Sequence, residues 1–208
     1  SKFSLGCLPK EDFPIIEIGN LENELNIDSQ IFLKLINKTR FAVSSEETRY
    51  FLNGIYFHKK QENDSSFLSV VATDGHRLSK FDFDLKEYTK EIPGVIIPKK
   101  TVNELSKLLN DFEGLIKINL DSNKIVFFVG ESILISKLID GNFPDYKRVI
   151  PTDNNNILKV NRQIFSLAVD RVSTITNEKS PVIKFKLLKN LMNMSSVNGE
   201  NGTATEDI

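Results

Sequence analysis

One pattern occurs three times in this chain and constrains its fold more than any other feature. Apolar residues recur at helical spacing in three segments, Ser29–Arg40, Lys99–Leu109 and Arg162–Val172, and Asp28-Ser29 supplies an N-cap for the first. Helical segments therefore start about every 65 residues, and Gln30-Ile31-Phe32 returns as Gln163-Ile164-Phe165. A period of this length indicates duplicated half-domains rather than a solenoid, because solenoid repeats are shorter.

Strand-like runs follow each helical segment. After the first two they are Tyr50–His58, Phe67–Thr73, Arg77–Phe83, Leu115–Leu120, Lys124–Val129 and Ile133–Ile139. Short turns such as Asp121-Ser122-Asn123 and Gly130-Glu131 make neighbouring runs antiparallel. The third repeat begins in the same way, with Val182–Leu188, Leu191–Val197 and a turn at Asn198–Gly202. These patterns predict an α+β fold of repeated units, each a helix plus an antiparallel β-meander.

Two such units make one domain. We therefore expect a complete domain over 26–150, the first half of another over 151–208, and the end of a preceding one over 1–25. Phe3 and Leu5 at one end and Thr203–Ile208 at the other are strand-like, which would leave ladder groups unpaired in a free-standing domain. The chain is accordingly expected to be an excerpt of a longer protein. Lys59–Ser66 is polar and is expected to form a mobile loop.

Composition excludes several classes of protein. A single cysteine, Cys7, rules out an internal disulfide framework and a multi-cysteine zinc site, which fits a reducing cytosol. No apolar run reaches the roughly 18 residues that span a bilayer, and the chain opens without a secretory leader. We expect a soluble cytoplasmic protein with no membrane partner.

Charge is divided unevenly along the chain. The three helical segments carry a surplus of six positive charges, although the whole chain has a net charge of −1. The bases include Lys34 and Lys38 in the first segment and Lys99 and Lys100 in the second. Solvated amphipathic faces would explain each helix alone. If the repeats place their helices on one side, the basic faces form a common surface for phosphate, which would bind DNA without reading its sequence.

Asp74-Gly75-His76-Arg77 invites a catalytic interpretation, because Asp and His together can perform acid–base chemistry. Asp-Gly between two strand-like runs is, however, the usual signal of a type I′ hairpin with Gly75 at positive φ. We therefore favour a turn or pocket wall for His76. The carboxylate pairs Glu46-Glu47 and Asp82/Asp84 lack metal-ligand spacing, and no phosphate loop or dinucleotide fingerprint is present, so no metal or cofactor is expected.

Two other segments combine basic and apolar residues. Arg49 and Tyr50 stand at a strand entrance, where they are either an edge arginine with a half-buried tyrosine or a phosphate or sugar contact. Phe143–Pro151 has prolines near both ends and lies at the expected domain boundary. It is typical of a stiff linker packed on both neighbours, and such junctions are common ligand sites.

These residues carry a family resemblance. The runs Phe41–Phe57, Val71–Leu78 and Lys137–Pro151 resemble signature segments of the bacterial DNA polymerase sliding clamp, the β subunit. The stretch from Phe3 to Pro14 is similar to the end of that family's first domain. Asp170–Ser173 and Asn177–Lys179 are similar to the start of its third. The resemblance covers essentially the whole chain in the right order.

The resemblance implies a DNA-clamp fold and a non-catalytic processivity factor without cofactors. Such a protein is a head-to-tail homodimer that closes around duplex DNA and tethers the DNA polymerase III α subunit, the clamp loader and other proteins that carry a clamp-binding motif. Partner peptides would enter a pocket between the second and third domains, whose walls here would be Leu52, Thr73, Gly75, His76, Arg77, Leu78, Pro144, Arg148 and Val149. DNA contacts would fall on Arg49, Tyr50, Lys99 and Lys100.

The chain is shorter than the family pattern. We expect this form alone to be unable to close a ring and to bind partner peptides weakly at most. Two rival hypotheses remain at this stage. A small hydrolase using Asp74 and His76 would need a hydrogen bond between them inside a cleft. A β-rich adaptor that binds peptides without encircling DNA would be favoured by basic helix faces that point in different directions.

Overall fold

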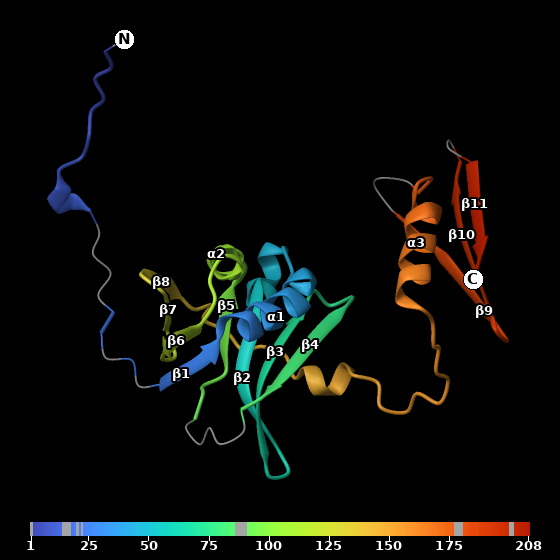
Figure 1. The fold of residues 1–208 in the computed structure, drawn as a ribbon, viewed down its shortest axis with the longest axis horizontal. Coiled ribbons are helices and arrows are strands. Elements are labelled where there is room, and N and C mark those ends of the chain that lie inside the picture. The colour runs from blue at the N-terminus through green and yellow to red at the C-terminus, as the bar shows by residue number, and fades with distance from the viewer. Residues whose placement is uncertain are drawn as a thin grey trace. The chain divides into compact units, whose positions relative to one another are not determined.

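The computed structural model describes residues 2–13, 18–19, 21, 23–85, 91–176, 181–199 and 202–208. The chain forms two compact units, Ser1–Val149 (unit 1) and Ile150–Ile208 (unit 2). Figure 1 shows the elements, which are η1 (Lys10–Asp12), β1 (Asn23–Asp28), α1 (Ser29–Thr39), η2 (Arg40–Ala42), η3 (Glu47–Leu52), β2 (Gly54–Glu62), β3 (Ser65–Thr73), β4 (Leu78–Asp84), β5 (Val95–Pro98), α2 (Lys99–Asn110), β6 (Leu115–Leu120), β7 (Lys124–Val129), β8 (Ser132–Lys137), η4 (Tyr146–Val149), α3 (Arg162–Ser173), β9 (Lys184–Leu188), β10 (Leu191–Asn198) and β11 (Gly202–Asp207). The predicted α+β repeat of one helix and three antiparallel strands is confirmed. Within the described ranges, no helix has the length and apolarity needed to cross a membrane.

The two repeats of unit 1 exchange strands. β5 comes just before α2, yet it pairs antiparallel with β2 and completes the sheet β4-β3-β2-β5. In the same way β1 comes before α1, yet it pairs with β6 and completes the sheet β1-β6-β7-β8. Each repeat therefore needs a strand from the other, which makes two half-domains into one cooperative unit. Unit 2 has the three-stranded sheet β11-β10-β9 in its described part.

A single hydrophobic core joins both sheets of unit 1 to the two helices. Phe32 of α1 lies at its centre, only 1% exposed, with ring centroids 6.1 Å from Phe57 of β2 and 5.9 Å from Phe127 of β7. α1 and α2 also pack against each other (Figure 1). Gln30 donates to the Leu109 carbonyl, and Arg40 donates to the Ser106 hydroxyl at 3.0 Å.

Side-chain caps fix where two of the helices begin. The predicted N-cap Asp28 accepts hydrogen bonds from the backbone N–H groups of Gln30 and Ile31, both at 3.0 Å. Asn161 caps α3 in the same way, through Gln163 and Ile164. α2 instead follows Pro98, which has no side chain able to accept a bond.

The outer face of the sheet β4-β3-β2-β5 is covered by the chain that follows β8. Val71 and Ile96 are buried although they lie on the opposite face from the core residues beside them in their strands. Ile139 donates to the Ile96 carbonyl at 3.0 Å, and Phe143 stacks on Tyr56 with centroids 4.8 Å apart. The prediction that the segment Phe143–Pro151 packs on the preceding domain is therefore confirmed for Phe143 and for Tyr146, which is buried against His58.

Three local predictions are wrong. Lys59–Ser66 is a hairpin rather than a mobile loop: β2 runs to Glu62, β3 starts at Ser65, and Asn63 takes the positive φ of the turn between them. Strand β2 starts at Gly54 rather than Tyr50, because Glu47–Leu52 forms the 3-10 helix η3. Phe3 and Leu5 form no strand and are highly exposed. The motif residues Asn177–Lys179, Pro14 and the middle of the Asn198–Gly202 turn lie outside the described residues.

Replacing Asp28 by Ala should lower the free energy of unfolding by about 1 kcal/mol, because two N–H groups at the start of α1 lose their acceptor. The matched variant Asp28→Asn keeps an oxygen in the same place and should lose much less. Urea denaturation followed by circular dichroism measures both. Equal losses for Ala and Asn would contradict a capping role.

Candidate functional site

The hairpin loop between β3 and β4 carries the most distinctive motif. Thr73 pairs with Leu78 at its base, and the Thr73 hydroxyl donates to the Arg77 carbonyl at 2.8 Å. Asp74 closes the loop, since one carboxylate oxygen accepts from the N–H groups of His76 and Arg77, each at 3.0 Å. Its other oxygen accepts from the Arg77 guanidinium at 3.0 Å. The loop is therefore held by its own side chains.

This loop is a hairpin turn, but it is not of type I′. Gly75 has the predicted positive φ, +90°. A type I′ turn on Asp-Gly also needs positive φ at Asp74, the other central residue, and Asp74 does not have it. His76 is exposed on the turn, while the Asp74 carboxylate is occupied by backbone N–H groups and Arg77. This geometry removes the hydrogen-bonded Asp–His pair in a cleft that the hydrolase hypothesis requires.

Arg49 braces the loop from the side. Glu46 accepts two hydrogen bonds from the Arg49 guanidinium, at 2.8 and 2.6 Å. A side chain on Gly75 would place its Cβ 2.5 Å from Nη1 of Arg49, so the glycine allows the guanidinium to lie directly against the loop backbone. The hydrogen bond from Arg49 lowers the pKa of Glu46, which keeps this pair ionised at neutral pH. Arg77 lies over the ring of Phe41, 5.8 Å from its centroid.

The second group of predicted pocket residues lies on the chain that covers the outer face of the sheet. Pro144 lines a hollow of about 310 Å³ together with Tyr56, His58 and Tyr146. Arg148 and Val149 belong to η4 and are strongly exposed, with 85% of the Arg148 side chain accessible although it pairs with Asp145 at 2.9 Å. A cation and an apolar side chain thus stand side by side at the surface.

Strand register and the hollow beside Tyr56 place Thr73, Leu78 and Pro144 on one face of the sheet. Tyr56 lies opposite Val71, and Thr73 follows Val71 by two residues, so the side chains of all three face the same side of the sheet. Pro144 packs beside Tyr56 on that side, and Leu78 lies opposite Thr73. Leu52 is 3% exposed and stands outside the main core, where it can supply support rather than open surface.

The predicted DNA-contact residues lie on α1, η3 and α2. Lys34 and Lys38 are four residues apart on the exposed face of α1, and Lys99 and Lys100 are exposed at the start of the neighbouring α2. The Lys34 ammonium lies 5.5 Å from the Phe81 ring centroid, and the Lys99 ammonium donates to the Ser45 hydroxyl at 2.6 Å. Tyr50 is 53% exposed on η3. The two helices that carry these lysines pack against each other within unit 1.

Sequence reasoning overlooked the residues that support these surfaces. Glu46 was interpreted as half of a carboxylate pair, but it instead accepts hydrogen bonds from Arg49. Residues three apart contact each other only in a helical turn, and the sequence did not predict a helix here. His58 looked like the end of a strand. Its ring stacks on Tyr56 with centroids 4.6 Å apart, and its Nε2 lies 3.1 Å from the Tyr146 hydroxyl. This hydrogen bond joins residues 88 positions apart, so no local sequence pattern predicts it.

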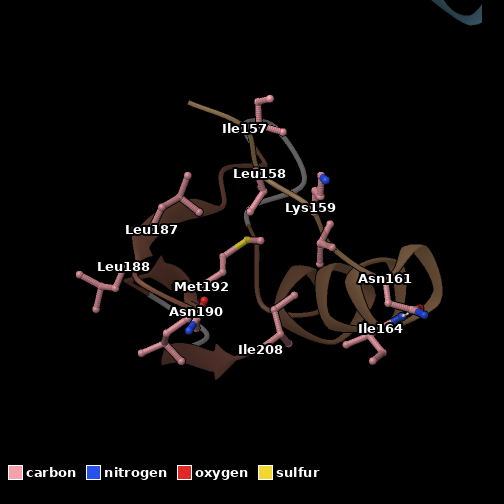
Figure 2. Close-up of a pocket in the computed structure, with 12 residues that line it drawn as sticks. Ile157, Leu158, Lys159, Asn161, Ile164, Leu187, Leu188, Asn190, Met192 and Ile208 are labelled. Atoms are coloured by element: carbon pink, nitrogen blue, oxygen red, sulfur yellow. Dashed lines mark hydrogen bonds between the residues drawn. The ribbon is translucent and has the colours of Figure 1, made fainter. Parts of the chain in front are cut away.

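Unit 2 contains an unpredicted apolar hollow of about 530 Å³ between α3 and its sheet. Figure 2 shows Leu158, Met192 and Ile208 converging on it. Ile164 also lines it, whereas Ile31, the matching residue of the first repeat, packs against the core of unit 1. The hollow thus exposes apolar surface that a second repeat covers in unit 1. Among the described residues, no group of three His, Cys, Asp or Glu could hold a metal ion.

Comparisons with known proteins agree across the chain. The family model "DNA polymerase III beta subunit, central domain" matches residues 26–145, and that of the C-terminal domain matches 147–208. The beta sliding clamp of Caulobacter vibrioides (strain NA1000 / CB15N) is 42% identical over 208 residues, which is 100% of this chain and 56% of the relative. That of Rickettsia bellii (strain RML369-C) is 41% identical over 211 residues, covering 100% and 54%.

Solved structures give the same result. A DnaN sliding clamp from Bartonella birtlesii bound to griselimycin has a TM-score of 0.93 and 44% identity, covering 99% of this chain and 55% of that one. The Caulobacter crescentus pol III beta structure has a TM-score of 0.91 and 42% identity, covering 100% and 56%. The chain therefore spans about half the length of the relatives it matches.

The loop should respond to acid through Asp74. Hydrogen bonds from the Arg77 and His76 N–H groups lower the pKa of Asp74 from 3.8 to about 2. A carboxyl whose folded pKa is lowered stabilises the fold above its ordinary pKa and loses that contribution as the pH falls through the folded value. Asp74→Asn should therefore be less stable than wild type at pH 7, and the gap should close between pH 4 and pH 2. Urea denaturation across this range measures it, and a gap independent of pH would contradict the assignment.

Proposed function

Because the chain belongs to the DNA polymerase III β-subunit family, we propose that it forms part of a sliding clamp that encircles duplex DNA and holds a replicative polymerase on it. The protein is then a non-catalytic processivity factor, a homodimer in its full-length form. The observation that carries the DNA role is the pair of adjacent helices α1 and α2 with exposed lysines in unit 1.

The proposed DNA contacts are Arg49, Tyr50, Lys34, Lys38, Lys99 and Lys100. Lysine ammonium groups neutralise phosphates without reading bases, so a clamp bound through them can slide. Glu104 on α2 is paired with Lys107 at 3.0 Å, which limits its repulsion of phosphate. Tyr50 offers an exposed ring on which a base can stack.

We place the peptide site on the outer face of the sheet β4-β3-β2-β5 and on the chain that covers it. The proposed pocket residues are Leu52, Thr73, Gly75, His76, Arg77, Leu78, Pro144, Arg148 and Val149. Leu78, Pro144 and Val149 suit apolar anchors of a partner peptide, while Arg77 and Arg148 suit its carbonyl or carboxylate oxygens. The α subunit of the polymerase, the clamp loader and other proteins with a clamp-binding motif are the proposed partners.

We also propose three parts of a clamp chain: 1–25 as the end of the first domain, 26–150 as the middle domain and 151–208 as the first half of the third. The compact units and the ranges of the family models support a boundary near residue 150. A peptide-only adaptor is the weaker alternative, because its expected sign was divergent basic faces, and the two helices of unit 1 lie together.

DNA binding by the helices can be tested through its salt dependence. Removing two phosphate contacts with Lys34→Gln and Lys38→Gln should reduce the slope of log K against log salt by about 2, since each contact contributes about 0.9. Fluorescence anisotropy with a labelled duplex measures the slope. Lys117→Gln on β6, whose side chain pairs with Glu24, is the control and should keep the wild-type slope. Equal slopes for all variants would exclude these helices as the DNA surface.

Peptide binding can be tested at Arg148. Arg148→Ala should weaken binding of a short peptide with leucine and phenylalanine anchors about fivefold or more, the worth of one charge-assisted hydrogen bond. Because the Arg148 side chain is 85% exposed, the fold should not change. Lys137→Ala, an exposed cation on β8, is the control and should bind as wild type does. Isothermal titration calorimetry decides, and equal affinity for Arg148→Ala would remove this residue from the pocket.

A further inference from the structure

Four aromatic rings fasten the chain after β8 to the outer face of the sheet. Phe143 stacks on Tyr56 with centroids 4.8 Å apart and planes 4° from parallel. Tyr56 stacks on His58 at 4.6 Å, and the His58 ring lies 5.8 Å from that of Tyr146. Tyr146 is 5% exposed. Two neighbouring rings of β2 thus lie between two rings of the covering chain.

The hydrogen bonds of His58 define its protonation state. Nδ1 lies 2.9 Å from the Lys59 carbonyl, which can only accept, so Nδ1 carries a hydrogen. Nε2 lies 3.1 Å from the Tyr146 hydroxyl. In the neutral imidazole with hydrogen on Nδ1, Nε2 is bare and accepts from that hydroxyl. A second proton on Nε2 would take away the acceptor of a buried phenol.

We propose that neutral His58 is a positioning residue that holds Phe143–Val149 on the sheet, so that acid loosens this segment and weakens peptide binding at Pro144, Arg148 and Val149. The binding part of this inference rests on the proposed peptide site. His58 itself is not placed in contact with the peptide. It acts through Tyr146, which begins η4, the turn that displays Arg148 and Val149.

The charges around His58 favour the neutral form. Burial lowers the pKa of His58 below its ordinary value of 6.5, and Lys147 of η4 and Lys80 of β4 act in the same direction. The Lys59 carbonyl and Asp82 of β4 oppose them. Asp82 is already engaged by the Ser69 hydroxyl at 2.7 Å and by Lys80 at 2.8 Å. The Lys60 ammonium also lies 3.8 Å from the Asp82 carboxylate. These partners neutralise most of the negative charge of Asp82, so Asp82 does little to stabilise a positive charge on His58.

The direction of the pH effect follows from this lowered pKa. Above pH 6.5 the imidazole is neutral whether the segment is docked or free, so docking does not change with pH. Below pH 6.5 the freed imidazole takes up a proton that the docked one resists. The docked state therefore loses up to about tenfold in its equilibrium constant per pH unit, until the docked imidazole also titrates.

Hydrogen–deuterium exchange of the 208-residue chain tests the docking directly. Between pH 7.5 and pH 5.5, protection of the Arg148 amide, which donates to the Asp145 carbonyl at 3.3 Å, should fall up to about tenfold after correction for intrinsic rates. The amides of β7 serve as an internal reference and should keep their protection. Protection at Arg148 that follows β7 at both pH values would overturn the proposal.

Two substitutions isolate the bond. His58→Phe keeps a ring in the stack but cannot titrate, so the pH dependence at Arg148 should disappear. Tyr146→Phe removes only the hydroxyl and should lower protection at pH 7.5 about threefold to tenfold. His76→Phe replaces the other histidine of the chain and should leave the pH dependence of Arg148 exchange intact. A pH dependence that survives His58→Phe, or one that vanishes with His76→Phe, would overturn the role of His58.

Peptide titrations separate this inference from the proposed function. With the same labelled peptide, the Kd should rise between pH 7.5 and pH 5.5 in parallel with exchange, and His58→Phe should remove that rise. A constant Kd alongside changing exchange would overturn the positioning role while leaving the peptide site in place. If no peptide binds at pH 7.5, the peptide site and the binding part of this inference fail, whereas the exchange data still decide whether His58 holds the segment on the sheet.

Discussion

Unit 1 depends on the exchange of one strand between its two repeats. β5 comes just before α2 of the second repeat but pairs with β2 of the first. β1 comes just before α1 of the first repeat but pairs with β6 of the second. Neither sheet is complete without the other repeat, and Phe32 contacts Phe57 of one sheet and Phe127 of the other. Because this ring is fully enclosed, the two halves must fold together. Both surfaces proposed for binding lie on unit 1 and are displayed by this shared core.

The sequence predicted the parts of the fold that local patterns determine. Helical periodicity placed all three helices, and Asp28 was identified as a cap because its bonds reach only two and three residues along the chain. The strand exchange was not predicted, since β1 and β5 pair with residues far away in sequence. The Lys59–Ser66 hairpin was missed because all of its residues are polar, a composition that is compatible with a loop as well as a strand.

The candidate site shows the same division. The Asp74–Arg77 turn was recognisable because Asp-Gly reports a hairpin, and Gly75 does adopt positive φ. Its turn type was wrong because Asp74 bonds the following N–H groups and so fixes a different geometry. The brace formed by Glu46 and Arg49, and the contact between His58 and Tyr146, arise from tertiary packing. Neither contact can be predicted from local sequence patterns alone.

One sheet separates the two surfaces proposed for binding. α1 covers the inner face of β3 and β4 and carries the exposed Lys34 and Lys38. The chain from Leu138 to Val149 covers part of the outer face, where Pro144 and η4 lie. A sheet between them would keep the proposed DNA surface apart from the proposed peptide site. Arg49 is the exception, because the same guanidinium pairs with Glu46 and rests on the Gly75 loop. Any phosphate that draws Arg49 away from Glu46 would also remove the brace from that loop.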